Sequence, residues 1–582
     1  MKKTLLTEVI CKAEQWMLGN YNEETKRAIR LMLDAEDKTE LIDSFYKNLE
    51  FGTGGLRGIM GAGTNRINIY TIGAATQGLA NYLKAQFDSQ TQISVVIGFD
   101  CRNQSDYFAQ TAANILTSSG IKIYLFDSLR PTPEISFAIR HLKCQAGINI
   151  TASHNPKEYN GYKVYWEDGA QIVSPHDVGV IKEVEKITDI NTISFEGNNE
   201  LLQRVGKDID DLYIQTIAKL KLAPESIEKY KDLKIVYTPI HGTGVELIPM
   251  AIRAYGFTNI INVPEQDIVS GNFPTVASPN PEEPEALDMA IKKACEVNAD
   301  IVMASDPDGD RVGIAVKDSN DKWILINGNQ MAVILCYYLI NKWRELGWIS
   351  GKEYIVKTIV TTEIIKELAV KNNIECVDCY TGFKWIASVI REREGIKKYI
   401  CGGEESYGFL PETFVRDKDA ISTCALLAEI TAWAKDKGKT IYELLQDIYL
   451  EYGYGKEKGI SIVRTGKSGA DEIARIMENF RNNPPVEIAD SAVSIVKDFK
   501  TLLQTNMLTG EKIALQMPNT SNVLQFFTTD GSKISIRPSG TEPKIKFYIE
   551  VRGNITDRSG YVEANKEATI KIEKIYTDLS DR

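Results

Sequence analysis

The sequence of 582 residues predicts an α/β protein with three similar α/β domains in tandem and a smaller α+β domain at the C-terminus. Three observations predict this class. Short, continuous apolar runs, typical of strands buried on both faces, alternate with helix-like stretches. This strand–helix plan occurs three times along the chain. From about residue 454 the pattern changes to helices mixed with strands of alternating polarity, which is typical of a different kind of domain.

The elements are expected in the following order. Residues 4–50 should be helical, because their apolar side chains recur at helical spacing. Three sets of three buried strands follow, at 94–100, 121–126 and 147–151, at 234–237, 260–263 and 301–304, and at 354–356, 374–377 and 398–401. Alternating strands at 534–536 and 544–551 belong to the last domain. We therefore expect domains at 1–225, 226–326, 327–450 and 451–582, arranged around a central cleft.

Composition excludes several classes of protein. The chain has 68 Lys and Arg against 79 Asp and Glu, a net charge of −11, which argues against partners such as nucleic acid or an anionic membrane. No apolar run is long enough to span a bilayer. Glu8 interrupts the apolar stretch near the N-terminus, so a signal peptide is not expected. The nine Cys are scattered, which favours a reduced, cytoplasmic protein over a disulfide framework.

Cys376 and Cys379 form a C-x-x-C motif, for which a zinc site and a redox site are both considered. A structural zinc site would need a second pair of ligands. A redox role is the alternative, but the motif lies in a strand-like run rather than at the start of a helix. Two small apolar residues in a buried strand are the favoured interpretation.

The third strand of each set runs directly into a polar loop, at 152–156, 305–311 and 402–408. Ligands of open α/β sheets bind at the carboxyl ends of the strands. The second loop carries Asp306, Asp308 and Asp310 at alternate positions. Three crowded carboxylates repel one another without a cation, and oxygen ligands suit magnesium, so a metal site is favoured over an acidic surface turn.

The first of these loops places Ser153 beside His154. A surface turn is one interpretation, since Ser, Asn and Pro are common in turns. A serine hydrolase fits poorly, because the G-x-S-x-G motif is absent and adjacent residues seldom supply nucleophile and base to each other. A serine hydroxyl opposite a magnesium site is better suited to carry a phosphoryl group.

Two further loops offer groups that bind anions and hydroxyls. Arg537, Ser539 and Thr541, with Gly540 between the last two, supply guanidinium and hydroxyl donors suited to a phosphate or carboxylate. Glu404 and Ser406 can accept from and donate to vicinal sugar hydroxyls. Either loop alone could be an ordinary solvated turn.

Together these loops resemble the α-D-phosphohexomutase superfamily. Four motifs occur in the order of the family: Thr151-Ala152-Ser153-His154-Asn155-Pro156, Asp306-Pro307-Asp308-Gly309-Asp310-Arg311, Gly403-Glu404-Glu405-Ser406 and Arg537-Pro538-Ser539-Gly540-Thr541. The resemblance covers residues from about 51 to 552. The segments 51–58 and 160–166 resemble the longer branch, which includes the bacterial α-phosphoglucomutases and the phosphoglucomutase-2/phosphopentomutase group.

The resemblance implies an enzyme whose active form carries phosphate on Ser153. That phosphate passes to the substrate, giving a sugar 1,6-bisphosphate that turns around and returns its other phosphate. Mg²⁺ would be held by Asp306, Asp308, Asp310 and the phosphorylated Ser153. The implied catalytic residues are Ser153, His154, Lys163 and Arg57, with either His154 or Lys163 as the proton shuttle. The implied substrate-binding residues are Arg311, Thr381, Gly382, Lys384, Glu404, Ser406, Lys418, Arg537, Ser539, Gly540 and Thr541.

Several alternatives stay open at this point. Lys384 and Lys418 could simply be solvated lysines. The loop around Glu404 resembles the glucose type, which favours interconversion of glucose 1-phosphate and glucose 6-phosphate. A phosphopentomutase, a phosphomannomutase or a sugar-bisphosphate synthase could use the same site, and in a phosphatase Asp306 would be the nucleophile. A sugar-phosphate-binding protein without activity is the last alternative. The expected partners are small sugar phosphates, and the chain is expected to be a monomer or a dimer.

Overall fold

The computed structural model describes residues 2–51, 55–88, 90–464, 466–539 and 544–580. The chain divides into two compact units, each described by itself below. The first comprises residues 1–327, 387–401 and 406–438, and the second comprises 328–386, 402–405 and 439–582. Within the described residues, no helix combines the length and apolar character needed to cross a membrane.

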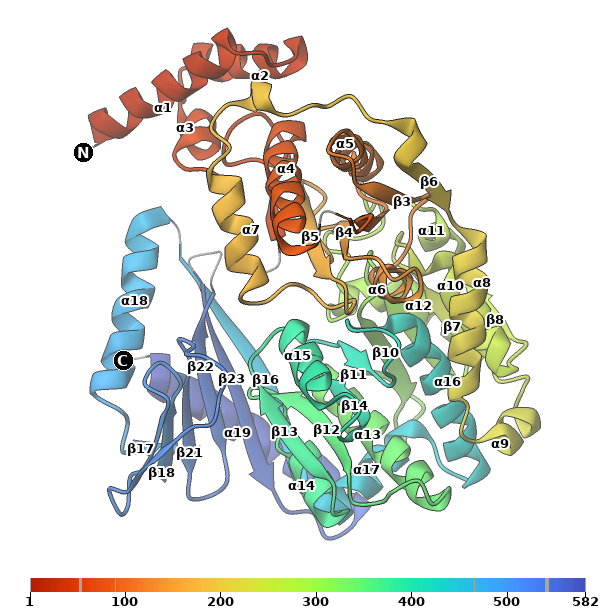
Figure 1. The fold of residues 1–582 in the computed structure, drawn as a ribbon. Helices are drawn as coiled ribbons and strands as arrows, with labels where there is room; N and C mark the ends of the chain where they lie inside the picture. The colour runs from red at the N-terminus through yellow and green to blue at the C-terminus, as the bar shows by residue number, and fades with distance from the viewer. Residues whose placement is uncertain (1, 52–54, 89, 465, 540–543, 581–582) are drawn as a thin grey trace. The chain divides into compact units, whose positions relative to one another are not determined.

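The first unit begins with a helical segment and a six-stranded domain. Its elements are α1 Lys2–Leu18, α2 Glu23–Asp34, α3 Thr39–Phe45, β1 Gly55–Ile59, α4 Ile69–Gln86, β2 Ser94–Phe99, α5 Ser105–Ser118, β3 Lys122–Phe126, α6 Thr132–His141, β4 Ala146–Ile150, β5 Tyr159–Trp166, α7 His176–Glu185, β6 Leu202–Val205, α8 Lys207–Ile217 and α9 Pro224–Lys229. The first three helices enclose a small core of their own around Trp16 and Phe45, and Tyr70 of α4 packs against it. Figure 1 shows them beside α4.

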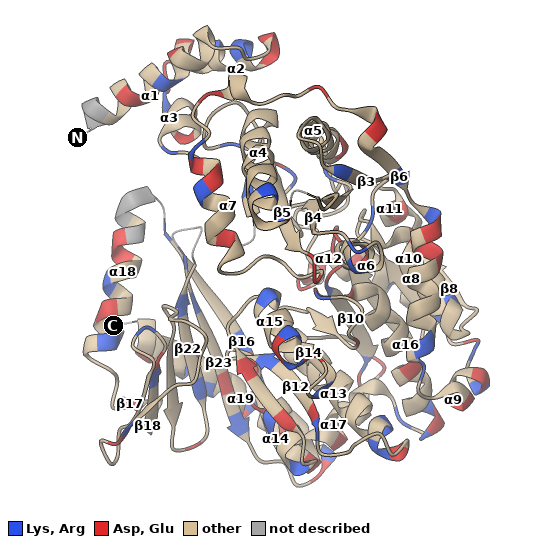
Figure 2. Cartoon of the chain, in the orientation of Figure 1, with Lys and Arg blue, Asp and Glu red and all other residues tan. Residues whose placement is uncertain are grey.

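A second domain of the same unit repeats the plan. Its elements are β7 Ile235–Thr238, α10 Gly244–Tyr255, β8 Ile260–Asn262, α11 Pro264–Asp267, α12 Pro284–Val297, β9 Ile301–Ser305, β10 Val312–Lys317 and β11 Trp323–Ile326. Two later segments, β15 Phe409–Leu410 and α16 Ala420–Asp436, also belong to this unit. Acidic and basic positions are interspersed along helices such as α8 and α9 (Figure 2), in keeping with a chain that carries many charges of both signs.

The two sheets of this unit share the order of four strands, β5-β4-β2-β3 in the first and β10-β9-β7-β8 in the second. The strand orders are β1-β5-β4-β2-β3-β6 and β11-β10-β9-β7-β8. In each, the first strand of the predicted set lies between the other two and is parallel to both. The third strand then pairs antiparallel with the strand that follows it in the chain. As a result, the loop after β4 and the loop after β9 occupy corresponding positions in the two domains.

Helices cover both faces of the first sheet, as predicted for buried parallel strands. Residues of α4 and α5 join those of β2, β3 and β4 in one hydrophobic core. On the other face α6 lies unusually close, because Gly98 and Gly147 have no side chain. A Cβ atom at Gly98 would lie 2.1 Å from Ile135 Cδ1, and one at Gly147 would lie 2.2 Å from Ile139 Cδ1. These two glycines therefore determine how closely α6 approaches the sheet.

The second unit holds elements of two further domains. They are α13 Gly328–Glu345, β12 Glu353–Thr358, α14 Ile364–Lys371, β13 Glu375–Cys379, α17 Ile441–Tyr452, β16 Tyr454–Val463, α18 Gly466–Asn482, β17 Glu487–Ile488, β18 Ser491–Asp498, β19 Leu503–Asn506, β20 Lys512–Ala514, β21 Leu524–Thr528, β22 Lys533–Pro538, β23 Lys544–Gly553 and α19 Tyr561–Ser580. β12 and β13 are parallel, whereas the pairs joining β16, β23, β22, β21, β18, β19 and β20 are antiparallel. α15 Phe383–Arg393 and β14 Lys398–Gly403 contain residues of both units.

The C-x-x-C motif lies within β13, as expected for two strand residues. Cys376 is half-buried and Cys379 is buried, and both are free thiols. Three residues apart on a strand, their side chains point to opposite faces. Burial raises the pKa of Cys376 to about 12, so a reactive thiolate is disfavoured there and the structural interpretation stands.

Candidate active site

The candidate site is built from two loops of the first unit that leave corresponding strands. One loop, residues 151–158, joins β4 to the antiparallel strand β5. The other, residues 306–311, joins β9 to the antiparallel strand β10. Both begin at the carboxyl end of a central parallel strand, where open α/β sheets place their ligands.

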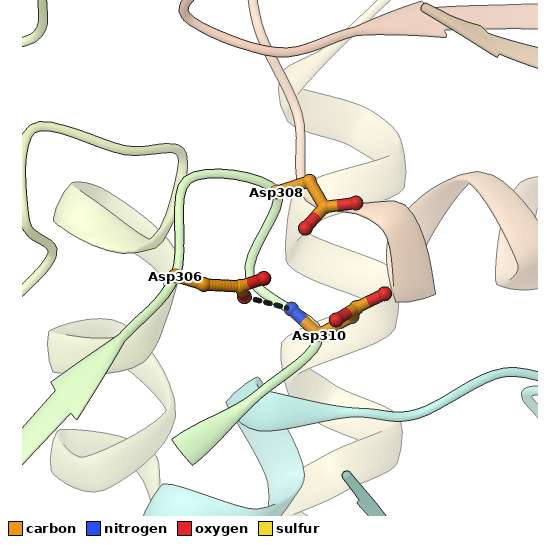
Figure 3. Close-up of side chains that lie close together, drawn as sticks. All are labelled: Asp306, Asp308 and Asp310. Atoms are coloured by element: carbon orange, nitrogen blue, oxygen red, sulfur yellow. Dashed lines mark hydrogen bonds between the residues drawn. The ribbon is translucent and has the colours of Figure 1, made fainter. Parts of the chain in front are cut away.

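Asp306, Asp308 and Asp310 form a buried cluster on the second loop. One carboxylate oxygen from each lies within 4.8 Å of the others. Asp306 Oδ1 accepts hydrogen bonds from the backbone N–H groups of Asp310 and Arg311, both at 3.0 Å, and these bonds fix the curvature of the loop. Figure 3 shows the three side chains close together, with the Asp306 carboxylate bonded to the backbone nitrogen of Asp310.

The cluster fits a hard divalent cation. Among the residues that the structure describes, no hydrogen-bond donor reaches the buried atoms Asp308 Oδ1 and Asp310 Oδ1. Burial raises the pKa of Asp306 well above its ordinary value, and repulsion from Asp308 and Asp310 raises it further. An all-oxygen donor set with two free buried oxygens is the arrangement that Mg²⁺ prefers.

Ser153 lies against this cluster. Its Oγ donates to Asp306 Oδ2 at 3.0 Å and lies 3.1 Å from His154 Nδ1. The side chain is buried, and the backbone has a φ of +55°, in the left-handed region that non-glycine residues rarely adopt. The Ser153 N–H donates to Thr151 Oγ1 at 2.9 Å, which helps to hold this conformation.

Two lysines approach the other side of the cluster. Lys163 Nζ lies 2.7 Å from Asp308 Oδ2 and 3.5 Å from Asp310 Oδ2. Lys418 Nζ lies 3.1 Å from Asp310 Oδ2, and its side chain is buried rather than solvated. Burial alone would lower the pKa of Lys163, but Asp308 and Asp310 outweigh it and raise that pKa above its usual value. Lys163 is therefore a fixed cation in this arrangement.

The pKa of His154 is shifted in the opposite direction from that of Lys163. Burial, together with the nearby cation of Arg311, lowers the pKa of His154 well below its usual value, so the ring is neutral. Arg311 itself donates from Nη1 to Glu282 Oε1 at 3.0 Å and to the carbonyl oxygen of Ser406 at 2.7 Å. This second bond brings the backbone of Ser406 next to the loop that carries the three aspartates.

Arg57 lies on β1 and is exposed. Its Nη1 donates to Asn155 Oδ1 at 3.2 Å, which places the guanidinium beside the loop that carries Ser153. Ser153 and His154 are thus in contact, Ser153 and Lys163 both contact the aspartate cluster, and Arg57 joins this group through Asn155.

The sugar-binding candidates of the second unit form a separate group. The carboxylate of Glu404 is buried, and its Oε1 accepts from the backbone N–H of Gly382 at 2.8 Å. Gly382 has a φ of +112°, a conformation that favours glycine. Thr381 and Lys384 are half-buried beside it, and Lys384 Nζ lies 5.5 Å from the centre of the Trp385 ring. The structure thus joins the Glu404 loop to the loop at 381–384.

The phosphate-binding candidates lie where β22 ends. Arg537 is half-buried and lies opposite Lys546 of β23. The backbone N–H of Ser539 donates to the carbonyl oxygen of Lys544 at 2.7 Å, which draws the two strands together at the turn. Gly540 and Thr541 lie outside the described residues.

Two residues that contact the site were not among the sequence candidates. Arg102 follows β2 and donates to backbone carbonyls of the Ser153 loop, and Thr132 Oγ1 at the start of α6 donates to Asp308 Oδ2 at 2.9 Å. Arg102 comes directly after a buried strand, so the rule applied to the other polar loops would have found it. Thr132 precedes a helix, and no sequence signal distinguishes it from an ordinary helix-start residue.

Comparison with protein families agrees with this geometry. Residues 48–191, 211–320 and 327–452 match the phosphoglucomutase/phosphomannomutase alpha/beta/alpha domains I, II and III, and residues 463–554 match the C-terminal domain of the same family. A phosphoglucomutase of Staphylococcus haemolyticus is 37% identical over 543 residues, which cover 92% of this chain and 96% of the relative. A phosphoglucomutase of Staphylococcus aureus is 37% identical over 528 residues, covering 90% and 93%.

Solved structures share the fold. A putative phosphomannomutase from Thermus thermophilus superposes with a TM-score of 0.65 at 21% identity, covering 90% of this chain and 99% of that one. The phosphoglucomutase pp63/parafusin from Paramecium, in its open form, gives 0.64 at 17% identity, with 92% and 96% covered. Because matched domains span most of the sequence and relatives are 37% identical over nine-tenths of it, the chain belongs to the phosphoglucomutase/phosphomannomutase family.

Proposed function

We propose that this protein is a phosphoglucomutase that interconverts glucose 1-phosphate and glucose 6-phosphate. The observation that supports the proposal most directly is the hydrogen bond from Ser153 Oγ to Asp306 Oδ2 at 3.0 Å, because it puts a serine hydroxyl at the edge of the buried aspartate cluster. The relatives named phosphoglucomutase support glucose as the sugar. Cytoplasmic location and action as a monomer or dimer are part of the same proposal.

The residues take the following roles. Asp306, Asp308 and Asp310 hold Mg²⁺, which when bound supplies positive charge to the phosphoryl oxygens. Ser153 carries the phosphoryl group: its Oγ–P bond breaks as a bond forms to the sugar hydroxyl, whose proton is released. The cation Lys163 stabilises the charge that spreads over the transferring group. Because the reaction is mainly positioning and charge stabilisation, these fixed groups account for most of what the chemistry requires.

His154 is the better proton carrier at Ser153 on geometric grounds. Its Nδ1 lies 3.1 Å from Ser153 Oγ, whereas the Lys163 ammonium is directed at Asp308. We propose that the neutral ring of His154 accepts the proton of Oγ when Ser153 is phosphorylated and returns it to Oγ when the phosphoryl group leaves. Arg57, held beside the loop by Asn155, stabilises the phosphoserine.

The remaining candidates bind the substrate. Glu404 and Ser406, with the loop of Thr381, Gly382 and Lys384, read the sugar hydroxyls. Arg311 and Lys418 lie beside the metal loop and contact the phosphorylated end. The non-reacting phosphate is bound by Arg537, Ser539, Gly540 and Thr541. Binding at that remote end orients a sugar 1,6-bisphosphate intermediate, which can then present either phosphate to Ser153.

Substrate turnover tests the proposal. Glucose 1-phosphate, mannose 1-phosphate and ribose 1-phosphate are offered separately in Mg²⁺ with a trace of the matching bisphosphate, with and without chelator. We expect chelator-sensitive conversion that is fastest with glucose 1-phosphate. Faster conversion of ribose 1-phosphate would make the protein a phosphopentomutase, and faster conversion of mannose 1-phosphate a phosphomannomutase. Absence of conversion with all three would refute a mutase.

Ser153→Ala is the matched control for the phosphoserine step. We expect it to lose turnover almost completely while it still binds glucose 6-phosphate in a calorimetric titration, because the substrate-binding residues are unchanged. Labelled bisphosphate should transfer acid-stable phosphate to the wild type and not to the variant. Base-labile phosphate on the variant would instead identify Asp306 as the nucleophile.

A further inference from the structure

Arg102 binds the main chain of the Ser153 loop at four points. Its Nη2 donates to the carbonyl oxygen of Ser153 at 2.6 Å and also to that of Asn155. Its Nη1 donates to the carbonyl oxygens of Pro156 and Tyr159 at 2.8 and 3.0 Å. One planar guanidinium therefore serves four acceptors, which a lysine ammonium with three donors on a single atom cannot reproduce.

An ion pair with Asp100, which follows the carboxyl end of β2, fixes the position of the guanidinium. Arg102 Nε lies 3.3 Å from Asp100 Oδ2, and both side chains are fully buried. Asp100 Oδ1 in turn accepts from the backbone N–H of Arg102 at 2.9 Å and from Ser105 Oγ at 2.8 Å. The ion pair is thus tied to the first turn of α5, and Arg102 has little freedom to follow the loop if the loop moves.

A segment of the second domain covers the guanidinium. The centre of the Phe273 ring lies 5.2 Å from Arg102 Cζ, and Phe273 is buried. Next to it, a Cβ atom at Gly271 would lie 2.4 Å from the backbone nitrogen of Asn103, so only glycine allows this approach. Asn103 Nδ2 also donates to Asn272 Oδ1 at 2.9 Å. The domain that supplies the three aspartates therefore packs directly on the arginine that holds the serine loop.

The loop needs such support. Ser153 has a φ of +55°, which is strained for a residue other than glycine, so this conformation persists only if its surroundings hold it. Arg102 donates to the carbonyl oxygen of Ser153, and Thr151 Oγ1 accepts from the backbone N–H of Ser153. These two contacts fix both peptide planes of Ser153 and hence the direction of Oγ toward Asp306.

We infer that Arg102, packed under Phe273, is a positioning residue for phosphoryl transfer at Ser153. This inference rests on the proposed function. Arg102 acts through the backbone of the loop and does not contact the substrate. A displacement of about an ångström at the nucleophile lowers a rate by about 100-fold, whereas substrate affinity depends on other residues.

The test compares Arg102→Lys with Arg481→Lys, a matched control. Arg481 is also largely buried and paired, with Nε 3.2 Å from Asp498 Oδ2, but it lies in the C-terminal domain. For Arg102→Lys we expect kcat to fall about 100-fold while KM for glucose 1-phosphate changes less than about threefold. Phosphorylation of Ser153 by glucose 1,6-bisphosphate should slow in parallel. Arg481→Lys should keep wild-type kcat.

A wild-type kcat in folded Arg102→Lys would overturn the inference, as would a loss confined to KM. If Arg102→Lys does not fold, Phe273→Leu replaces it, because it removes the ring face and keeps an apolar side chain. A fall of about tenfold in kcat at unchanged KM supports the inference, and wild-type kcat overturns it. The proposed function fails separately, by an inactive wild type, so the two failures are distinguishable.

Discussion

The hydroxyl of Thr132 lies against the loop of Asp306, Asp308 and Asp310 and has two partners. It donates to Asp308 Oδ2 at 2.9 Å and accepts from Asn149 Nδ2 at 2.8 Å. Thr132→Val keeps the shape and removes both bonds. Because outer hydrogen bonds orient metal ligands, we expect Mg²⁺ affinity to fall about tenfold, measured by calorimetric titration. Thr132→Ser, which keeps the hydroxyl, should bind as the wild type does. Equal dissociation constants for the valine and serine variants would contradict this role.

At the residue scale, a sequence pattern indicates which side chains lie together more readily than it indicates contacts with the main chain. The sequence predicts that Asp306, Asp308 and Asp310 lie together around a cation, because crowded carboxylates repel one another without one. In the structure the three carboxylates do lie close together. The strand-end rule could have drawn attention to Arg102, but not to its contacts, because its partners are backbone carbonyls more than fifty residues away and backbone acceptors leave no trace in the sequence.

At the scale of elements, the pairing of β16 with β23 contains a like-charge pair. Glu457 lies directly opposite Glu550 in the antiparallel register. Burial, with a contribution from Glu550, raises the pKa of Glu457 from 4.5 to about 7. The folded protein therefore holds a proton that the unfolded chain releases between these two values. Its stability must fall as the pH rises through that range, because the native state then binds more protons than the unfolded one.

Glu457→Gln tests this linkage. Glutamine resembles the protonated acid, so the variant should lose less stability than the wild type between pH 5 and about pH 8. Urea unfolding across that range gives the comparison. Glu487→Gln, an exposed carboxylate of the same domain, should follow the wild-type profile. Parallel profiles for Glu457→Gln and the wild type would show that Glu457 does not carry the effect.

The sequence predicted the parallel strands of the repeated domains better than their antiparallel strands, for a physical reason. The parallel strands appear as continuous apolar runs, and β2, β3, β4, β7, β8 and β9 lie where these runs predict them. The antiparallel strands were not predicted as part of the repeat. β5 is buried along nearly its whole length, so it lacks the alternation that reveals an antiparallel strand.

At the scale of the whole molecule, the two compact units should respond differently to the metal. The cluster of Asp306, Asp308 and Asp310 lies in the first unit. A ligand that binds only the folded state stabilises it by about 2.7 kcal/mol at a hundredfold excess over its dissociation constant. In calorimetry we therefore expect Mg²⁺ to raise the transition of the first unit and leave that of the second unchanged. Asp310→Asn should abolish the shift; a shift of both transitions would contradict the assignment.

The close contact between Gly309 and Pro131 limits which domains could be exchanged between related proteins. Gly309 has a φ of +65°, and a Cβ atom there would lie 2.7 Å from Pro131 Cβ. Nearby, the backbone N–H of Thr132 donates to the carbonyl oxygen of Asp308 at 2.8 Å. The two domains share the order of four strands. The acidic turn of the second domain nevertheless packs directly against the start of α6 in the first. In a chimera that exchanges the first domain alone, the new helix start would not fit the acidic turn. We therefore expect these two domains to be exchangeable only as a pair.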